Sequence, residues 1–293
     1  MTDLPTLTSL AFENRYEPRQ HLWLDGPHGG WLAFDRVLRR DVILNIPYRS
    51  DDNNRFFETA QLRAGLRHTN LIPIYDFGVS QDGTPFFTEP HLQAIDLREL
   101  SKAEKSGNPL RILWNRLCFL LQASGALAFL HANDLLHLAL TPQSVLITRT
   151  FKEVFLVGSL NALPLAKPQT ENLSGIVAGV PAYLAPEQTD PDRLGPPTEA
   201  TDVFGLGGIL YYILFGDPPN QGTRPAEILE LLSKRQGPPL PGNFQFTDSR
   251  SRNLSKKLET SCLRALESDP AKRQQNVKDF SNEIEEVLMG TSG

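Results

Sequence analysis

The stretch Phe129–Leu160 reads FLHANDLLHLALTPQSVLITRTFKEVFLVGSL and lies near the middle of the chain. Apolar residues recur in it in short runs, among them Leu138 with Leu140, Val145–Ile147 and Val154–Val157. Short apolar runs that are bounded by polar and turn residues are typical of strands buried inside a domain. The pattern therefore predicts a packed segment at the centre of a fold.

Three further pieces of sequence follow this stretch in order. They are GVPAYLAPEQ at Gly179–Gln188, DVFGLG at Asp202–Gly207 and LESDPAKR at Leu266–Arg273. Together with the frame around His137, they closely resemble four segments of Ser/Thr protein kinases. These are the catalytic segment, the end of the activation segment, the central helix and a later arginine-bearing segment. The resemblance covers about residues 16–288 of the chain.

By this resemblance the chain is identified as a member of the protein kinase-like superfamily, of the bacterial Ser/Thr type. The family implies an α+β fold with two lobes. The small lobe is expected to hold an antiparallel sheet with one main helix, and the larger lobe to be mostly helical. We expect an N-terminal arm over residues 1–19, the small lobe over residues 20–92 and the larger lobe over residues 93–290, as one kinase-like domain.

Hydrophobic periodicity gives a coarse prediction of the elements. The predicted strands of the small lobe are Trp31–Asp35, Val42–Ile46, Asn70–Phe77 and Pro85–Thr88, with a hairpin turn at Asp82-Gly83. The predicted helices are Asp52–Arg67, Leu110–His131, Asp202–Phe215, Ala226–Lys234, Leu254–Glu267 and Val277–Val287. The helix at Asp202–Phe215 is apolar on all sides, which predicts a helix through the interior of a lobe.

The composition is that of an ordinary globular protein, with 293 residues of which 40% are hydrophobic and 22% charged. The formal net charge of −5 disfavours non-specific binding to nucleic acid or anionic membranes. Cys118 and Cys262 lie in apolar helical runs and predict free thiols. The first residues lack the features of a signal peptide and no apolar run reaches membrane-span length, so we expect a cytoplasmic protein.

Phosphoryl transfer by kinases depends on a lysine and Mg²⁺ that hold the phosphates and on a carboxylate that orients the hydroxyl. The resemblance places a different residue at each of these positions. The replacing residues all lack a charge, and they are Asn45, Ala139, Thr141, Ser144, Gly158 and Val180. The resemblance therefore implies a degenerate member of the family, a pseudokinase.

Each replacement removes a specific chemical group. Asn45 stands for the phosphate-binding lysine and Ala139 for the catalytic aspartate. Ser144 and Gly158 stand for the asparagine and the aspartate that hold Mg²⁺, and a hydroxyl is a weak ligand for this ion. Val180 stands for a threonine that, in the family, forms hydrogen bonds with the catalytic aspartate and with a lysine. Here these two partners are Ala139 and Thr141, so the losses are consistent with one another.

The glycine-rich loop that covers the phosphates is incomplete. Gly26 and Gly29 fit two of its three glycines, but Pro27 between them lacks an amide donor. A plain turn is favoured, and a phosphate cradle stays open as the alternative. No lysine occurs before Lys102 that could replace the missing one.

By resemblance, an adenine-sized slot would lie near Glu89 and His91, with Asp96 as a candidate ligand for a ribose hydroxyl. Pro90 and Glu89 make this slot atypical. We expect no cofactor. Binding of ATP with Mg²⁺ is expected only under the alternative that the chain is a residual kinase.

The family glutamate of the small-lobe helix is ambiguous in this sequence. Counting back from the following loop places Thr59 at its position, whereas a slip of one residue places Glu58 there. Glu58 shares a helical face with Leu62 and Leu66, which favours Glu58. The tripeptide DFG at residues 76–78 copies a metal motif, but it precedes His137 in the chain and is predicted to be a turn.

Residues that the family uses for architecture are kept. The resemblance pairs Glu187 with Arg273, which holds the activation segment to the larger lobe. It assigns Asp202 to capping the backbone of the catalytic loop and His137 to packing at the base of that loop.

The leading hypothesis is a pseudokinase that acts as a scaffold or allosteric regulator in signalling and binds protein partners, for example an active kinase. The larger lobe and the segment Gly158–Glu187 are the expected docking surfaces, and Thr170 and Ser174 are candidate phosphorylation sites. The alternatives are a residual or atypical ATP-dependent Ser/Thr kinase, and a sensor of nucleotides or small molecules that uses the cleft between the lobes.

Overall fold

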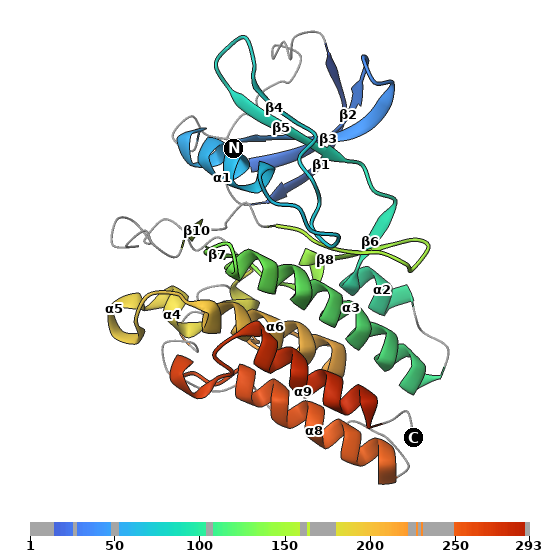
Figure 1. Ribbon diagram of the computed structural model, residues 1–293, viewed down its shortest axis with the longest axis vertical. Coiled ribbons are helices and arrows are strands. Elements are labelled where there is room, and N and C mark those ends of the chain that lie inside the picture. The colour runs from blue at the N-terminus through green and yellow to red at the C-terminus, as the bar shows by residue number, and fades with distance from the viewer. Residues whose placement is uncertain are drawn as a thin grey trace. The chain divides into compact units, whose positions relative to one another are not determined.

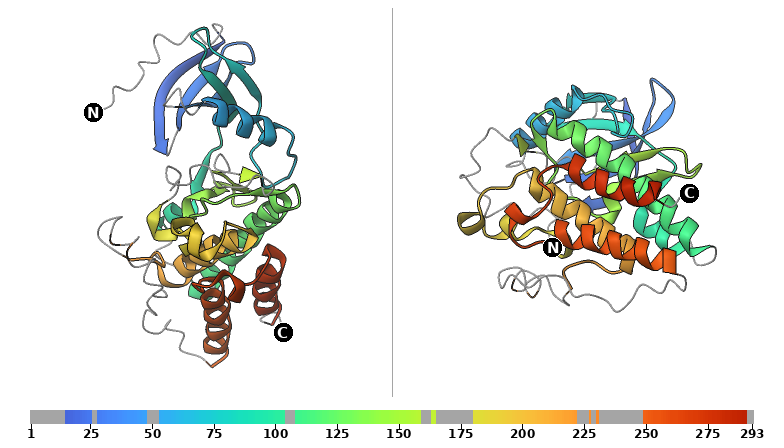
Figure 2. Two further views of the ribbon diagram at one scale, coloured as in Figure 1. Left: turned by 90° about the vertical axis from the view of Figure 1, so that its left-hand side faces the viewer. Right: turned by 60° about the horizontal axis from the view of Figure 1, so that its bottom comes forward.

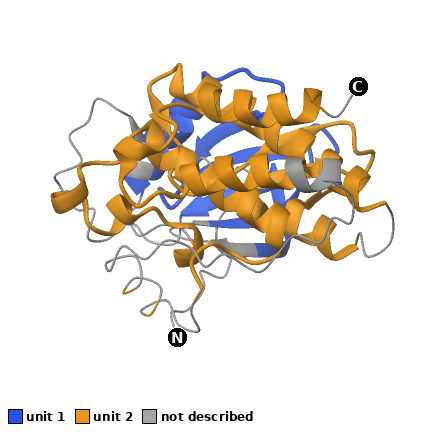
Figure 3. Ribbon diagram, turned by 90° about the horizontal axis from the view of Figure 1, so that it is seen from below, with its two compact units in different colours: residues 1–93 blue, residues 94–293 orange. Residues whose placement is uncertain are grey.

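The computed structural model of the protein shows two compact units, residues 1–93 and residues 94–293 (Figure 3). Each unit is described by itself below. The residues that the structure describes are 15–25, 28–47, 53–103, 108–158, 163–164, 180–221, 227, 230 and 249–290.

Unit 1 is an antiparallel sheet with one helix, as predicted. The sheet has the order β1-β2-β3-β5-β4, and every neighbouring pair in it is antiparallel (Figure 1). Its elements are β1 (Tyr16–Asp25), β2 (His28–Asp35), β3 (Arg40–Pro47), α1 (Asn53–Ala64), β4 (Asp76–Val79) and β5 (Pro85–Pro90). The β4–β5 hairpin turns where the sequence predicts it, and Gly83 takes a positive φ of 88° there.

Two predictions for unit 1 are wrong. The expected arm over residues 1–19 ends too late, because β1 begins at Tyr16 and pairs with β2. The expected strand Asn70–Phe77 is mostly irregular, and β4 begins only at Asp76. Pro73 interrupts that run, and a proline has no amide hydrogen to donate to a ladder.

The buried face of α1 also differs from the prediction. Phe56, Thr59 and Ala60 are buried, which is the spacing of one helical face. Glu58 is exposed, and Leu62 on its side of the helix is 42% exposed. The structure therefore places Thr59 on the inward face of α1, and Glu58, which the sequence favours, on the exposed face.

Unit 2 contains small sheets and a group of helices. Its strands are β6 (Ala94–Asp96), β7 (Leu135–Leu136), β8 (Val145–Thr148), β9 (Val154–Leu156) and β10 (Leu163–Pro164). Its α-helices are α2 (Leu97–Ala103), α3 (Pro109–His131), α4 (Pro186–Thr189), α5 (Pro191–Leu194), α6 (Glu199–Phe215), α8 (Ser249–Ala265) and α9 (Val277–Met289). Short 3₁₀ turns in the described residues of the unit include Pro142–Ser144, Pro181–Tyr183 and Pro270–Lys272.

The prediction of a mostly helical larger lobe is confirmed, with shifted ends. α8 begins five residues before the predicted start at Leu254. Of the predicted helix Ala226–Lys234, only residues 227 and 230 are described, and both are helical. The rest of that prediction lies outside the described residues.

Helix α6 is the centre of unit 2. Every residue from Ala200 to Leu214 is buried, and α6 packs against α3, α8 and α9 (Figures 1 and 2). Thr198 begins the helix with a capping box, and Gly216 ends it with a positive φ of 82°. An apolar helix of this kind places the polar residues of its first turn, including Asp202, at fixed positions inside the unit.

One helix in the described part of the chain, α3, has the length and apolar composition of a membrane span. It packs against α6 and α9, and Leu113, Leu117, Leu120 and Leu127 on it are buried. The core helix of a globular unit meets the same two criteria, so this observation is weak evidence for a span.

The close packing of α6 on α8 gives a testable prediction. A Cβ atom added at Gly207 would lie 2.7 Å from the Cβ of Ala265. We expect Gly207→Ala to lower the free energy of unfolding by about 1–3 kcal/mol through overpacking. Chemical denaturation measures this change.

The matched control is Gly125→Ala, in the exposed face of α3. Nothing lies within 4 Å of the Cβ that this substitution adds. It should raise the free energy of unfolding by about 0.5–1 kcal/mol, because alanine favours a helix over glycine. Equal effects of the two substitutions would contradict the packing described here.

Candidate functional site

The site that corresponds to a kinase catalytic loop is held by Asp202 of α6. Its Oδ2 accepts a hydrogen bond from the backbone N of His137 at 2.8 Å, and its Oδ1 accepts one from the backbone N of Leu138 at 2.7 Å. The carboxylate is 1% exposed. Asp202 thus has the capping position that the resemblance assigned to it, and both of its oxygens are committed to the loop.

The loop backbone is strained at the residue that Asp202 holds. Leu138 has a φ of 61°, in the left-handed region that non-glycine residues rarely adopt. Its carbonyl oxygen accepts a hydrogen bond from Nε2 of Gln188 at 2.9 Å, so the residue is fixed from both sides. Gln188 follows Glu187, and it ties the loop to the segment that ends in helix α4.

His137 is fully buried at the base of the loop. Its Nε2 lies 2.9 Å from the carbonyl oxygen of Val157, and its Nδ1 accepts a hydrogen bond from the backbone N of Ala139 at 3.3 Å. A donor at Nε2 and an acceptor at Nδ1 are the two roles of a neutral imidazole. The ring therefore joins the loop to the end of β9.

Ser144, at the position of the metal-binding asparagine, uses its hydroxyl inside the protein. The Oγ donates to the carbonyl oxygen of Ala139 at 3.1 Å and accepts from the backbone N of Thr141 at 3.2 Å. Thr141 Oγ1 lies 3.3 Å from the same oxygen. Both residues are buried, so a metal ion at Ser144 would have to break these hydrogen bonds first.

Gly158, at the position of the metal-binding aspartate, has a φ of 88°. A Cβ atom built there would lie 3.6 Å from Cε1 of His137 and 3.8 Å from Oγ of Ser144. These are ordinary van der Waals distances, so a Cβ atom at this position is not excluded by crowding. An aspartate would carry only the cost of the left-handed backbone, which it tolerates better than most residues.

Ala139, Thr141 and Val180 line one small pocket under the loop, together with Leu140 and Tyr183. The three positions at which the resemblance implies a lost polar network therefore lie together. Thr141 is buried, whereas Val180 is 43% exposed. Asp202 is the carboxylate among the residues that line this pocket, and both of its oxygens already accept hydrogen bonds from the loop.

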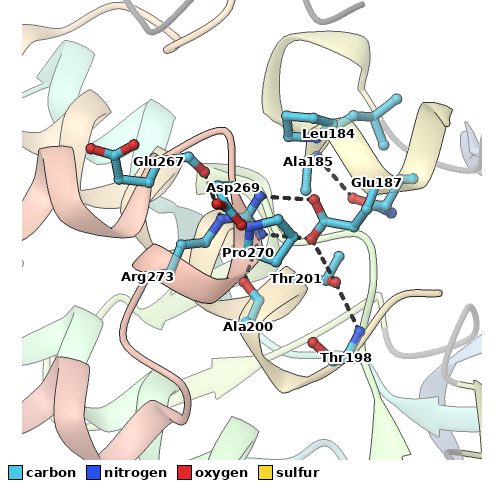
Figure 4. Close-up of polar contacts among 12 residues, drawn as sticks. Leu184, Ala185, Glu187, Thr198, Ala200, Thr201, Glu267, Asp269, Pro270 and Arg273 are labelled. Carbon is cyan, nitrogen blue, oxygen red and sulfur yellow. Dashed lines mark hydrogen bonds and ion pairs between the residues drawn. The ribbon is translucent and has the colours of Figure 1, made fainter. Parts of the chain in front are cut away.

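Glu187 and Arg273 form a buried ion pair, as Figure 4 shows. The guanidinium donates to the two carboxylate oxygens at 2.6 and 2.8 Å, and the two side chains are 1% exposed or less. Arg273 also donates to the carbonyl oxygens of Ala200 and Glu267, and Thr201 donates to Glu187. The partners of both charges are therefore provided within unit 2.

His131, at the end of α3, contacts the same oxygen of Asp202 that accepts the hydrogen bond from the backbone N of His137. Its Nε2 lies 2.8 Å from Asp202 Oδ2, and its Nδ1 lies 3.4 Å from Glu199 Oε2. Burial lowers the pKa of His131, but the hydrogen bond to Asp202 and the charges of Asp202 and Glu199 outweigh it and raise the pKa above its usual value.

In unit 1, Asn45 is buried and does not present a free amide. Its Nδ2 donates to Oε2 of Glu89 at 3.1 Å, and the other oxygen of Glu89 accepts from Arg63 at 2.5 Å. Gly29 lies within β2, between Leu24 of β1 and Ile46 of β3. Gly26 and Pro27 lie outside the described residues.

The other expected nucleotide contacts are Asp96 and His91. Oδ1 of Asp96 accepts a hydrogen bond from the backbone N of Glu99 at 2.7 Å, and Oε2 of Glu99 accepts one from the backbone N of Asp96. This is the reciprocal arrangement of a capping box, and it begins α2. His91 is exposed.

The tripeptide DFG at residues 76–78 is a strand, not the predicted turn, because it forms most of β4. The carboxylate of Asp76 accepts hydrogen bonds from Arg15 and from the hydroxyl of Tyr16. Asp76 thus joins β4 to the start of β1 inside unit 1 and is committed to structure.

The residues present at the two metal positions do not fit the Mg²⁺ that active kinases use. Ser144 and Gly158 offer one committed hydroxyl and no carboxylate, and Mg²⁺ binds proteins mainly through anionic oxygens. Among the described residues, no group of three or more His, Cys, Asp or Glu is arranged to hold a metal ion.

Sequence reasoning missed four residues of the site, and they are Arg63, His131, Gln188 and Thr201. A histidine at the end of the apolar run Leu110–His131 was the one available signal, because a polar group in a buried run requires a partner. Arg63 and Gln188 gave no signal, since their partners are 26 and 50 residues away in the sequence.

The buried ion pair gives a stability prediction. Arg273→Ala should lower the free energy of unfolding by about 3–5 kcal/mol, because it leaves the Glu187 carboxylate buried without its counter-charge. Arg264→Ala is the matched control, since Arg264 is 53% exposed in its ion pair with Glu283. It should cost about 0–1 kcal/mol in the same denaturation experiment. Similar losses of unfolding free energy in both variants would contradict the prediction that the buried ion pair of Glu187 stabilises the fold more than the exposed pair does.

The raised pKa of His131 gives a pH prediction. Its stabilising effect is complete below the unfolded-state pKa of about 6.5 and is lost as pH rises through the higher folded-state pKa. Melting temperatures at a series of pH values should fall more from pH 6 upward for the wild type than for His131→Gln. His91→Gln changes an exposed histidine and should leave the wild-type profile unchanged. A His131→Gln profile parallel to that of the wild type would contradict the prediction.

Comparison with known proteins agrees with this geometry. The family model for the protein kinase domain matches residues 44–283. The chain is 31% identical over 77% of its length to the DNA damage-responsive serine/threonine-protein kinase RqkA of Deinococcus radiodurans. It is 27% identical over 97% of its length to the serine/threonine-protein kinase PknB of Mycobacterium tuberculosis, and 25% identical over 94% to PknD of Chlamydia felis.

The chain spans only part of each of these relatives, namely 33% of RqkA, 44% of PknB and 31% of PknD. The two-unit fold, the loop held by Asp202 and the Glu187–Arg273 pair are found in a sequence that the family model matches over most of its length. The chain belongs to the protein kinase domain family.

Proposed function

We propose that the chain is a catalytically inactive protein-kinase-like domain, a pseudokinase, which acts as a scaffold or allosteric regulator in signalling. The observation that carries the proposal is the state of the loop between His137 and Gly158. Its backbone is held as a kinase loop requires, while the catalytic carboxylate is a methyl group at Ala139 and the metal ligand at Ser144 is committed to the backbone.

No described residue of the loop supplies the missing base. Asp202 is the acid that lines the pocket beside Ala139, but its two oxygens already accept hydrogen bonds from the loop and it is 1% exposed. The loss of a positioned base alone lowers a rate by about 10²–10⁴-fold. Loss of the metal ligands adds to this, although such effects are not additive.

The small lobe supports the same proposal. Where a lysine would hold the phosphates, Asn45 donates to Glu89, whose negative charge would repel a phosphate group brought to the same place. The proposal therefore includes the expectation that no nucleotide or Mg²⁺ cofactor is needed.

A role in binding proteins follows from what is retained. The Glu187–Arg273 pair and the Asp202 contacts hold the catalytic loop and the segment near helix α4 in place, although neither contact supplies a catalytic group. We propose a protein partner, for example an active kinase, that recognises this held surface of the larger lobe in the cytoplasm. Thr170 and Ser174 lie outside the described residues, and their phosphorylation stays a prediction.

The second candidate function is a residual or atypical ATP-dependent Ser/Thr kinase. The relatives favour it, since RqkA, PknB and PknD are named as serine/threonine-protein kinases. A sensor of nucleotides or other small molecules is a third candidate that the same binding experiment tests.

Calorimetry and thermal shift with ATP, with and without Mg²⁺, test the proposal. A ligand at 100 times its dissociation constant stabilises a protein by about 2.7 kcal/mol, so binding would be seen as a raised melting temperature. We expect no Mg²⁺-dependent shift for the wild type at millimolar ATP. Mg²⁺-dependent binding together with transfer of phosphate to a protein substrate would overturn the pseudokinase and support the second candidate.

Two controls sharpen this experiment. The kinase domain of RqkA, assayed in the same buffer, shows that an active relative would be detected. The variant Ser144→Asn with Gly158→Asp restores the amide and the carboxylate at the two metal positions, and the space at Gly158 admits a side chain. A Mg²⁺-dependent shift in this variant alone would assign the loss of the metal to these two residues.

A further inference from the structure

Three polar side chains from three elements of unit 1 meet in its interior. They are Asn45 of β3, Arg63 of α1 and Glu89 of β5, which we call the Glu89 network. Glu89 is the common partner, because one of its oxygens lies 2.5 Å from Arg63 and the other 3.1 Å from Asn45. The side chains of Arg63 and Glu89 are 9% and 13% exposed, and Asn45 is 1% exposed.

The charges of this network are opposite to those of an active kinase. There a lysine on the strand pairs with a glutamate on the helix, and this pair must be in place for activity. Here the helix carries the cation at Arg63, the sheet carries the carboxylate at Glu89, and the strand residue Asn45 is neutral. At the position of the helix glutamate, Thr59 is buried.

Aromatic packing strengthens the contact. The guanidinium of Arg63 lies 5.5 Å from the centre of the Phe87 ring, and the ring of Phe56 from α1 lies 5.1 Å from the same ring. A charge pair that is largely shielded from water in this way interacts more strongly than one on the surface. The exposed pair of Arg36 with Glu17, at 57% and 45% exposure, lies in the same unit for comparison.

We propose that the Glu89 network is a charge-reversed replacement for the lysine–glutamate pair, and that it holds α1 on the sheet of unit 1 without any ligand. Glu89 is the positioning residue, since both α1 and β3 reach it. The proposal does not rest on the absence of phosphoryl transfer and would stand if the chain were an active kinase.

One consequence concerns the position of Asn45. Its amide group is directed at Glu89, so a lysine placed there would meet the Glu89 carboxylate before any phosphate. Asn45→Lys therefore gives Glu89 a second cation and makes Arg63 less necessary. It would not restore a free phosphate-binding group while Glu89 is present.

A double-mutant cycle on the intact chain tests the proposal. Arg63→Gln and Glu89→Gln should each lower the melting temperature by about 4–8 °C, and the double variant should lower it little further. Hydrogen exchange of the α1 amides should become about tenfold faster or more in each single variant, with no ligand present. Unit 2 amides should be unaffected.

The exposed pair provides the control cycle. Glu17→Gln and Arg36→Gln should each shift the melting temperature by less than about 2 °C, with additive effects. Additive effects at Arg63 and Glu89, or unchanged exchange of the α1 amides in both single variants, would overturn the proposal.

A second cycle avoids any change at Glu89, in case Glu89→Gln fails to fold. Arg63→Gln should lower the melting temperature less in the Asn45→Lys background than in the wild type, because the new ammonium pairs with Glu89. An equal or greater loss in that background would show that Glu89 is not the shared partner and would reject the network.

Discussion

The Asp202 carboxylate is the interaction on which unit 2 depends. It joins the first turn of α6 to the backbone of His137 and Leu138 and to the ring of His131. A buried carboxylate needs such partners, because an unpaired charge in the interior is costly. The apolar surface of α6 fixes where the carboxylate lies, and the carboxylate then fixes a loop whose backbone is strained at Leu138. The shape of the loop therefore does not depend on catalytic groups.

Residues that hold the fold differ from residues that stand at the positions of catalytic groups. Glu187, Arg273 and Asp202 are paired with groups of the protein itself, and each would leave a buried charge if its partner changed. Ala139 and Gly158 stand where groups of a ligand would be met, and no buried partner depends on their side chains. Loss of chemistry without loss of fold is physically possible because these two sets of residues do not overlap.

Unit 1 keeps a charged contact between its helix and its sheet although the lysine is missing. Its helix–sheet contact uses a cation on α1 and a carboxylate on β5, so a polar contact persists where the lysine is missing. Unit 2 replaces its polar network with apolar side chains and hydroxyls that bond to the backbone. A buried charge pair can be reversed in sign, whereas a metal site that loses its anionic ligands has no such equivalent.

The sequence by itself determined the two-lobed α+β fold, the apolar helix α6, the β4–β5 hairpin and the loss of groups at Asn45, Ala139 and Gly158. Helix α6 and the hairpin follow from local periodicity and turn chemistry, which are properties of neighbouring residues. The two lobes and the replaced groups are what the family resemblance of short motifs implies. The tertiary structure alone decided that α1 buries Thr59 rather than Glu58, because two adjacent phases of one helix fit the same apolar pattern. It also decided that Arg63 meets Glu89 and that Gln188 holds Leu138, since pairs so distant in sequence become neighbours only when the chain packs.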